Sequence, residues 1–180
     1  AKVYSNPKEA QNMLMKMGEI VGDLLADQVI HGGADAVQLF DTWAGLLSPE
    51  IYRKFAMPAT AKTIEVFREK VGREVPVIHY AKGSGHLHPD IRDLDLNAIS
   101  LDWRDDLSVN REKFGNKFAF QGNLDPSLLH GSTEMAKLAT RKVLDAAGDK
   151  PGHIFNLGHG FAPSARIECV ETVLREIVGE

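Results

Sequence analysis

The chain has 180 residues, of which 43% are hydrophobic and 26% are charged, and its formal net charge is -4. These values are typical of a soluble globular protein with enough apolar residues to bury a core. They exclude two classes of protein: no run reaches the roughly 18 apolar residues of a membrane span, and no basic stripe is available to follow a nucleic-acid backbone.

A long amphipathic helix is the first predicted element. Asn6-Pro7 opens it, apolar residues recur at helical spacing, and Gly32-Gly33 closes it because glycine tolerates positive φ. The apolar run 36–40 follows and is too short for a helix, so it predicts a buried strand. That strand ends at the polar cluster 41–45.

The same helix and strand unit then repeats. Ser48-Pro49 predicts a helix start, a kink is expected near Pro58, and Gly72 ends the helix. A strand at 75–80 follows and leads into the polar segment 82–86. Three further strands are expected at 98–101, 118–120 and 153–156, with helices between them, notably 133–147 and 165–178.

Alternating strands and helices predict right-handed crossovers and a parallel α/β sheet. Each expected strand is apolar through its body and ends in glycines and polar groups, as in folds whose sites lie at the carboxyl ends of parallel strands. We therefore expect all five polar clusters to converge on one face. A (β/α)₈ barrel needs eight strands and about 250 residues, so the pattern leaves two alternatives, an open doubly wound sheet or part of a barrel.

Two strand ends carry the strongest candidates for a binding site. His159 follows the last strand between two glycines, so its imidazole can approach a ligand closely and exchange protons near neutral pH. Phe40, Asp41, Thr42 and Trp43 combine an aromatic wall with an acid and a hydroxyl, a set suited to a planar or bowl-shaped organic ligand. The alternatives are a histidine that caps a turn, and core roles for the two aromatic residues with Asp41 as a turn residue.

The other strand ends supply cations and amides. Lys82 and Arg104 each follow a strand and are candidates to neutralise substrate carboxylates, although solvated surface positions explain them equally well. Gln121 and Asn123 are candidates to touch a ligand or to orient neighbouring loops. Asp125 precedes a proline and is expected to cap the next helix.

The remaining reactive side chains favour structural roles. His79, His86 and His88 lack an accompanying carboxylate or thiol motif, so no metal site is predicted. Cys169, the single cysteine, is spaced with apolar residues on a helix and is expected in the core. A lone cysteine excludes an internal disulfide, and the first residues lack the features of a signal peptide, so the cytoplasm is the expected location.

Taken together, five strand-end segments resemble successive motifs of the uroporphyrinogen decarboxylases. They are 38–45, 81–83, 100–104, 121–126 and 153–160. Five motifs in one order are far more specific than any single short pattern. The resemblance implies that residues 1–180 form the carboxy-terminal portion of a single (β/α)₈ barrel domain, with about its last five strands.

The resemblance also implies a function. Members of the family bind uroporphyrinogen, a tetrapyrrole with acetate and propionate arms, and convert its four acetates to methyl groups without metal or organic cofactor. Protonation of a pyrrole ring provides the electron sink, and an enzyme aspartate stabilises the resulting cation. That aspartate, the arginines and a tyrosine of the family have no counterpart here, so we expect the chain alone not to catalyse decarboxylation.

Some site residues carry over by motif. Thr42 stands at the family's serine or threonine substrate contact, His159 matches its substrate-binding histidine, and Phe40 matches an aromatic residue of the cleft wall. The resemblance further suggests a homodimer, or association with the missing amino-terminal portion.

Two rival functions remain open. A corrinoid-dependent methyltransferase has a similar barrel but uses zinc held by a His-x-Cys pair and a later cysteine, whereas His79 is followed here by Tyr80 and Ala81. A catalytically silent module for tetrapyrrole binding or assembly is the alternative from a different class, because the edges of a partial barrel favour association.

Overall fold

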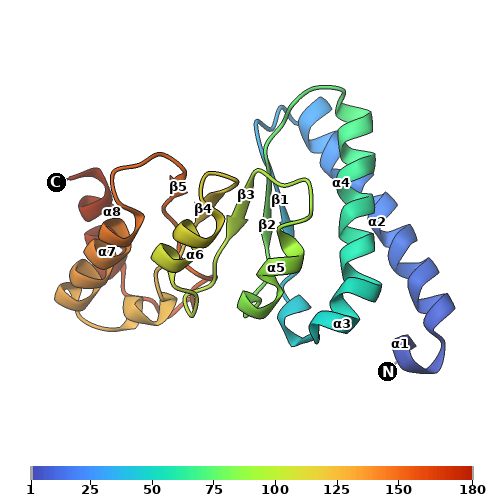
Figure 1. Ribbon diagram of the computed structural model, residues 1–180. Coiled ribbons are helices and arrows are strands. Elements are labelled where there is room, and N and C mark those ends of the chain that lie inside the picture. The colour runs from blue at the N-terminus through green and yellow to red at the C-terminus, as the bar shows by residue number, and fades with distance from the viewer. Residues whose placement is uncertain (1, 180) are drawn as a thin grey trace. The chain divides into compact units, whose positions relative to one another are not determined.

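The computed structural model describes residues 2–179, which form two compact units, one ending at Asn97 and the other beginning at Ala98. Each unit contains parallel strands with helices beside them, as Figure 1 shows. None of the helices between Lys2 and Gly179 is long and apolar enough to cross a membrane.

The first unit contains a pair of parallel strands and two long helices. β1 pairs with β2 in the register Val37↔Val77 to Phe40↔Tyr80. Its α-helices and strands are α1 (Lys2–Ser5), α2 (Pro7–Ile30), β1 (Val37–Phe40), α3 (Pro49–Ile51), α4 (Met57–Val71), β2 (Val77–Tyr80) and α5 (His88–Ile91). The 3₁₀ turns η1 (Ala44–Leu46) and η3 (Gly85–Leu87) and the π-helical turn η2 (Tyr52–Ala56) complete it.

Two glycines allow α2 and α4 to pack closely side by side (Figure 1). A Cβ atom at Gly18 would lie 2.6 Å from the carbonyl oxygen of Ala59, and one at Gly22 would lie 2.8 Å from the Cβ of Val66. Any larger residue would force these helices apart, so the sequence of α2 is adapted to this contact.

The second unit continues the alternation with three parallel strands. β3 (Ala98–Ser100) pairs with β4 (Ala119–Gln121), and β4 pairs with β5 (His153–Ile154). α6 (Leu107–Phe114) follows β3, and the turn η4 (Pro126–His130) and α7 (Thr133–Ala147) follow β4. α8 (Ile167–Val178) follows β5.

α7 and α8 enclose the core of the second unit. Buried side chains gather there from both helices and from the loop after β4: Leu124, Leu129, Ala136, Cys169 and Val173. Above this core the buried carboxylate of Glu176 pairs with Lys137 at 3.3 Å and with Arg141, so the two helices are also joined by charge. The prediction that Cys169 is a core residue is confirmed.

Most predicted elements are confirmed, and the differences have local causes. The helix after Ser48 is interrupted by η2, because Pro58 has no N–H to donate to the carbonyl of Lys54. β2 begins only at Val77, since Pro76 contributes its carbonyl but no donor to the ladder. β5 is shorter than predicted and resumes as a single parallel bridge between Leu124 and Leu157.

Candidate functional site

In the first unit, the ends of β1 and β2 bring two polar segments together. Asp41 and Thr42 directly follow β1, Lys82 follows β2, and the backbone N–H of Asp41 donates to the carbonyl of Tyr80 at 2.8 Å. All three polar side chains are half-buried. The parallel register therefore places the hydroxyl, the acid and the cation at the same end of one strand pair.

The aromatic residues of the β1 end face solvent in this unit. Phe40 is 70% exposed and Trp43 is 72% exposed, so the interpretation of both as core residues is wrong. Phe40 meets Tyr80 edge to face, with ring centroids 6.1 Å apart. An exposed aromatic ring held by a buried one is suited to contact an organic ligand.

Gly45 holds the two loops of the first unit against each other. A Cβ atom there would lie 2.0 Å from the carbonyl oxygen of Lys82, which no real side chain allows. His86 Nε2 also lies 2.9 Å from the carbonyl oxygen of Leu47, so the loop after β2 contacts the loop after β1 at a second point. These contacts hold the backbone that follows Thr42 against the backbone at and after Lys82.

A cavity of about 200 Å³ opens beside the β1 end. Apolar residues of α2 and α4 form most of its lining, together with Asp41 and the fully buried His79. Burial raises the pKa of the Asp41 carboxyl, while burial and the nearby His88 lower the pKa of His79 to about 4. His79 is therefore neutral at physiological pH.

In the second unit, an ion pair shapes the end of β3. The carboxylate of Asp102 is fully buried and accepts hydrogen bonds from the Arg104 backbone N–H at 2.8 Å and from Arg104 Nε at 3.0 Å. The Arg104 side chain remains 54% exposed, and its guanidinium lies 4.8 Å from the centroid of the Trp103 ring. Arg104 thus neutralises a buried acid while keeping one side toward solvent.

The amides after β4 organise the neighbouring loop. Asn123 Nδ2 donates to the carbonyls of Asp102 at 2.9 Å and Asp105 at 2.7 Å, and Gln121 Nε2 donates to Ser100 Oγ at 3.0 Å. The expectation that Asn123 orients a neighbouring loop is confirmed. Asp125 accepts from the Ser127 N–H as the cap of η4, also as predicted.

The loop after β5 brings His159 onto the β3 end. The imidazole of His159 stacks on Trp103, with ring centroids 6.2 Å apart and an interplanar angle of 28°. Gly158 makes this approach possible, because a Cβ atom there would lie 2.2 Å from the backbone nitrogen of Trp103. His159 is half-buried and belongs to a joint assembly of three strand ends.

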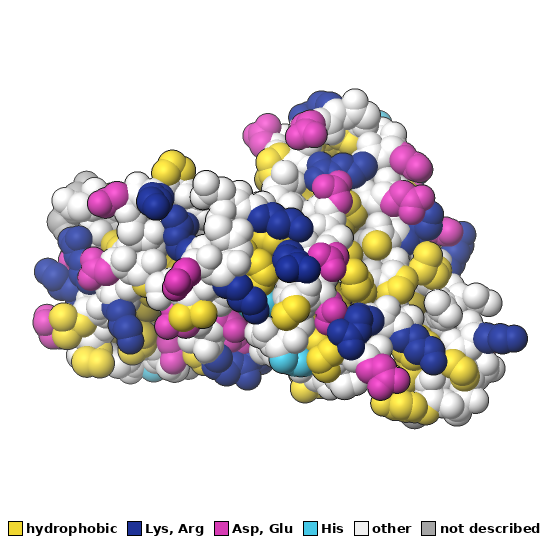
Figure 2. All heavy atoms as spheres, viewed as in Figure 1, with side chains coloured by type: hydrophobic (Ala, Val, Ile, Leu, Met, Phe, Trp, Pro, Cys, Tyr) yellow, Lys and Arg dark blue, Asp and Glu magenta, His cyan; other side chains and the backbone are white. Residues whose placement is uncertain are grey.

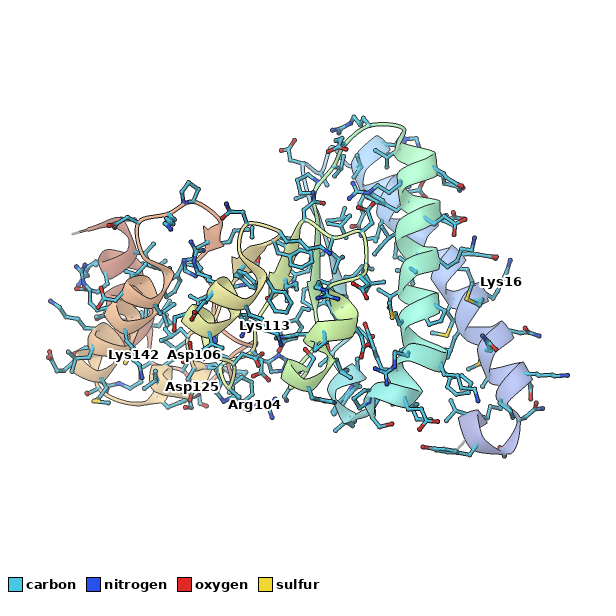
Figure 3. The ribbon with its side chains drawn as sticks, in the orientation of Figure 1. Lys16, Arg104, Asp106, Lys113, Asp125 and Lys142 are labelled. Carbon is cyan, nitrogen blue, oxygen red and sulfur yellow. The ribbon has the colours of Figure 1, made fainter. Side chains whose placement is uncertain are left out.

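A second cavity, of about 450 Å³, lies beside the β3 and β4 ends. Figure 3 labels Arg104, Asp106, Asp125 and Lys142, which contribute charges of both signs to its lining. On the face drawn in Figure 2, cationic and anionic side chains are likewise interspersed. This mixture does not by itself select an anionic ligand.

Sequence reasoning did not assign roles to two residues that organise this assembly. Asp102 and Trp103 lie within the motif segment 100–104, where Asp102 is a fully buried acid and the Trp103 ring stacks on His159. The signal that identifies them is the acid, aromatic and cation in succession at a strand end. Thr42 and His159 lie in different units, so their convergence on one ligand stays a prediction.

Two histidines of the first unit, His86 and His88, have polar contacts within the protein. His88 Nε2 lies 3.5 Å from Ser84 Oγ, and His86 Nε2 contacts the Leu47 carbonyl. Across residues 2–179, no group of three or more His, Cys, Asp or Glu side chains is arranged to hold a metal ion.

Comparison with known proteins identifies the family. The family model described as "Uroporphyrinogen decarboxylase (URO-D)" matches residues 1–178. The chain belongs to the uroporphyrinogen decarboxylase family. A uroporphyrinogen decarboxylase of Magnetococcus marinus is 38% identical over 99% of the chain, and one of Pseudomonas aeruginosa is 39% identical over 91% of it. The match covers 50% and 46% of those relatives, so the chain spans about half their length.

A solved structure supports the fold. A methyltransferase from Methanosarcina mazei superposes with a TM-score of 0.71 over 86% of the chain and 44% of its own, at 19% identity. At that identity the likeness bears on architecture alone. With the family assignment it confirms the predicted fold class, an α/β chain that forms part of a (β/α)₈ barrel.

Proposed function

We propose that this chain supplies substrate-binding strand ends of a uroporphyrinogen decarboxylase, a carboxy-lyase that converts uroporphyrinogen to coproporphyrinogen in heme biosynthesis. The observation that carries the proposal is the family match along residues 1–178, with polar residues at the strand ends of both units. Since the chain spans about half of its relatives, catalysis requires the remaining part of the enzyme.

The site residues fall into two groups by what their side chains already contact. His159 and Thr42 are proposed to donate hydrogen bonds to substrate carboxylates, with Phe40 as part of the aromatic wall. Lys82 and Arg104 are proposed to supply positive charge. The buried Asp102 holds the Arg104 guanidinium in place at the end of β3.

Gln121 is proposed to support the site from within. It is 6% exposed and donates to Ser100, so its contribution is to hold the ends of β3 and β4 together beneath the substrate. We further propose that the complete enzyme is a cytoplasmic homodimer and that the tetrapyrrole binds without a metal or organic cofactor.

The test combines binding with complementation. We expect the purified chain to bind uroporphyrinogen under anaerobic conditions, measured by isothermal titration calorimetry, but not to decarboxylate it. Adding the complementary half of the Magnetococcus marinus relative is expected to restore turnover, measured by chromatographic separation of the oxidised products according to their number of carboxyl groups.

Matched variants make this test specific. His159→Asn is expected to weaken binding about tenfold, the loss of one hydrogen bond to a charged group, whereas His130→Asn on the exposed turn η4 should have no effect. Thr42→Val is likewise expected to weaken binding, and Thr133→Val is its control and should have no effect. Binding that none of these changes weakens would contradict the proposed site, and turnover by the chain alone would contradict the requirement for a second half.

The positions of cysteine in this chain do not support the methyltransferase alternative, which needs a His-x-Cys zinc site. Ala81 occupies the position two residues after His79, and the single cysteine of the chain is buried between α7 and α8. A thiol ligand for zinc is therefore not available beside His79.

A further inference from the structure

The end of β3 presents Trp103 on a rigid support. Its neighbours on both sides are fixed, since Asp102 and Arg104 form an ion pair and Asn123 binds the carbonyls of Asp102 and Asp105. The guanidinium of Arg104 also contacts the Trp103 ring at 4.8 Å. The backbone around Trp103 is thus fixed and one cation packs on its ring, the kind of support that a group which orients another residue needs.

The loop after β5 places His159 against Trp103. The N–H of Gly158 donates to the carbonyl of Leu124 at 2.7 Å, and the missing Cβ of Gly158 lets this loop touch the backbone of Trp103. The imidazole then stacks on the indole, with ring centroids 6.2 Å apart and planes inclined by 28°. Offset stacking of aromatic rings at this separation is attractive and biases the orientation of the imidazole.

We propose that Trp103 is a positioning residue that sets the orientation of the His159 imidazole toward a carboxylate of the substrate. This inference takes its ligand from the proposed function. The geometry of the ring pair is independent of that function. Trp103 acts through His159, and the Asp102–Arg104 pair and Asn123 act through Trp103.

The first experiment measures the stacking of His159 on Trp103 in the absence of ligand. In the full chain, the imidazole carbon-bound protons of His159 should show the ring-current shift that a stacked indole produces in NMR spectra. Trp103→Leu is expected to abolish this shift and Trp103→Phe to retain part of it. Unchanged His159 resonances in Trp103→Leu would overturn the inference.

The second experiment measures how the loss of this stacking changes the affinity for uroporphyrinogen. Trp103→Leu is expected to weaken uroporphyrinogen binding about fivefold, and Trp103→Phe is expected to retain most of the binding. Gly158→Ala keeps the indole side chain but adds a Cβ that would clash with the Trp103 backbone and separate the two rings, so it should weaken binding similarly. Gly160→Ala is the matched control, since a Cβ there meets no atom within 4 Å. Binding as tight as wild type in both Trp103→Leu and Gly158→Ala would contradict the inference.

A double-mutant cycle separates positioning from direct contact. If Trp103 acts through His159, the Trp103→Leu/His159→Asn double variant binds no more weakly than His159→Asn alone. Additive losses would mean that Trp103 touches the substrate itself and would overturn the inference. If the wild-type chain does not bind uroporphyrinogen, the proposed function fails, and the ring-current measurement alone decides the role of Trp103.

Discussion

His79 shows how burial governs an ionisable side chain in this chain. The ring is fully buried, neither nitrogen has a hydrogen-bond partner among the described residues, and its pKa is lowered from 6.5 to about 4, first by burial and then by His88. In the unfolded chain the same ring ionises near its ordinary pKa. Between these two values the unfolded state therefore binds more protons than the folded state.

We predict that the free energy of unfolding decreases as pH falls from about 6.5 to about 4, by roughly 3 kcal/mol from this residue. Urea unfolding of His79→Leu should show a shallower dependence over this range, because the variant removes the ionisable ring. His130→Leu, at an exposed position, is the control and should follow the wild type. Equal pH dependence in wild type and His79→Leu would contradict the prediction.

At the level of elements, the contact between α2 and α4 is expected to reverse the usual effect of a glycine-to-alanine substitution on stability. In an exposed helix, replacing glycine by alanine stabilises by about 1 kcal/mol. Gly18 lies against the carbonyl of Ala59, and overpacking of such a contact costs about 1–3 kcal/mol. We therefore predict that Gly18→Ala lowers the free energy of unfolding, whereas Asn12→Ala on the exposed side of α2 leaves it unchanged or raises it.

Thermal and urea unfolding measure both α2 variants in the same way. A Gly18→Ala chain that is more stable than wild type would show that α2 and α4 separate easily, and that their close packing does not determine the stability of the first unit.

The start of α7 provides a second element-scale prediction. Ser132 caps the helix by accepting a hydrogen bond from the Met135 N–H at 3.2 Å. We predict that Ser132→Ala lowers the free energy of unfolding by about 1 kcal/mol. Ser164→Ala, at an exposed loop position, should have no measurable effect in the same urea titration.

Elements with strong local signals were predictable from the sequence. Ser48 caps its helix through its own side chain and Gly72 ends the next one through its own positive φ, and most side chains of β2 to β4 are buried. The prediction of a buried strand at 36–40 is only partly right, because Phe40 at the end of β1 is exposed. The stack of His159 on Trp103 was not predictable, because it depends on a contact between residues 56 positions apart that only Gly158 permits. The missing partners of His79 escaped prediction for the same reason, since burial of both ring nitrogens is a property of the packed unit.

At the scale of the whole molecule, each unit has a helix with an uncovered apolar face. On α2 these residues recur at spacings of four and three, namely Met13, Met17, Ile20 and Leu24. On α8 they are Ile167, Leu174, Ile177 and Val178. Because the relatives are about twice as long as this chain, we expect their remaining part to cover these faces in the complete enzyme.

The uncovered faces predict that the chain alone self-associates as its concentration rises, because burial of each large apolar side chain is worth about 1.5–3 kcal/mol. Sedimentation velocity should show this, and Met17→Lys/Ile20→Lys should reduce it. Gln11→Lys/Gln28→Lys adds the same charge to α2 at exposed polar positions and should not. A chain that stays monomeric at every concentration, and gains no partner from the complementary half, would show that these faces are tolerated in water and would contradict the expectation that the rest of the barrel covers them.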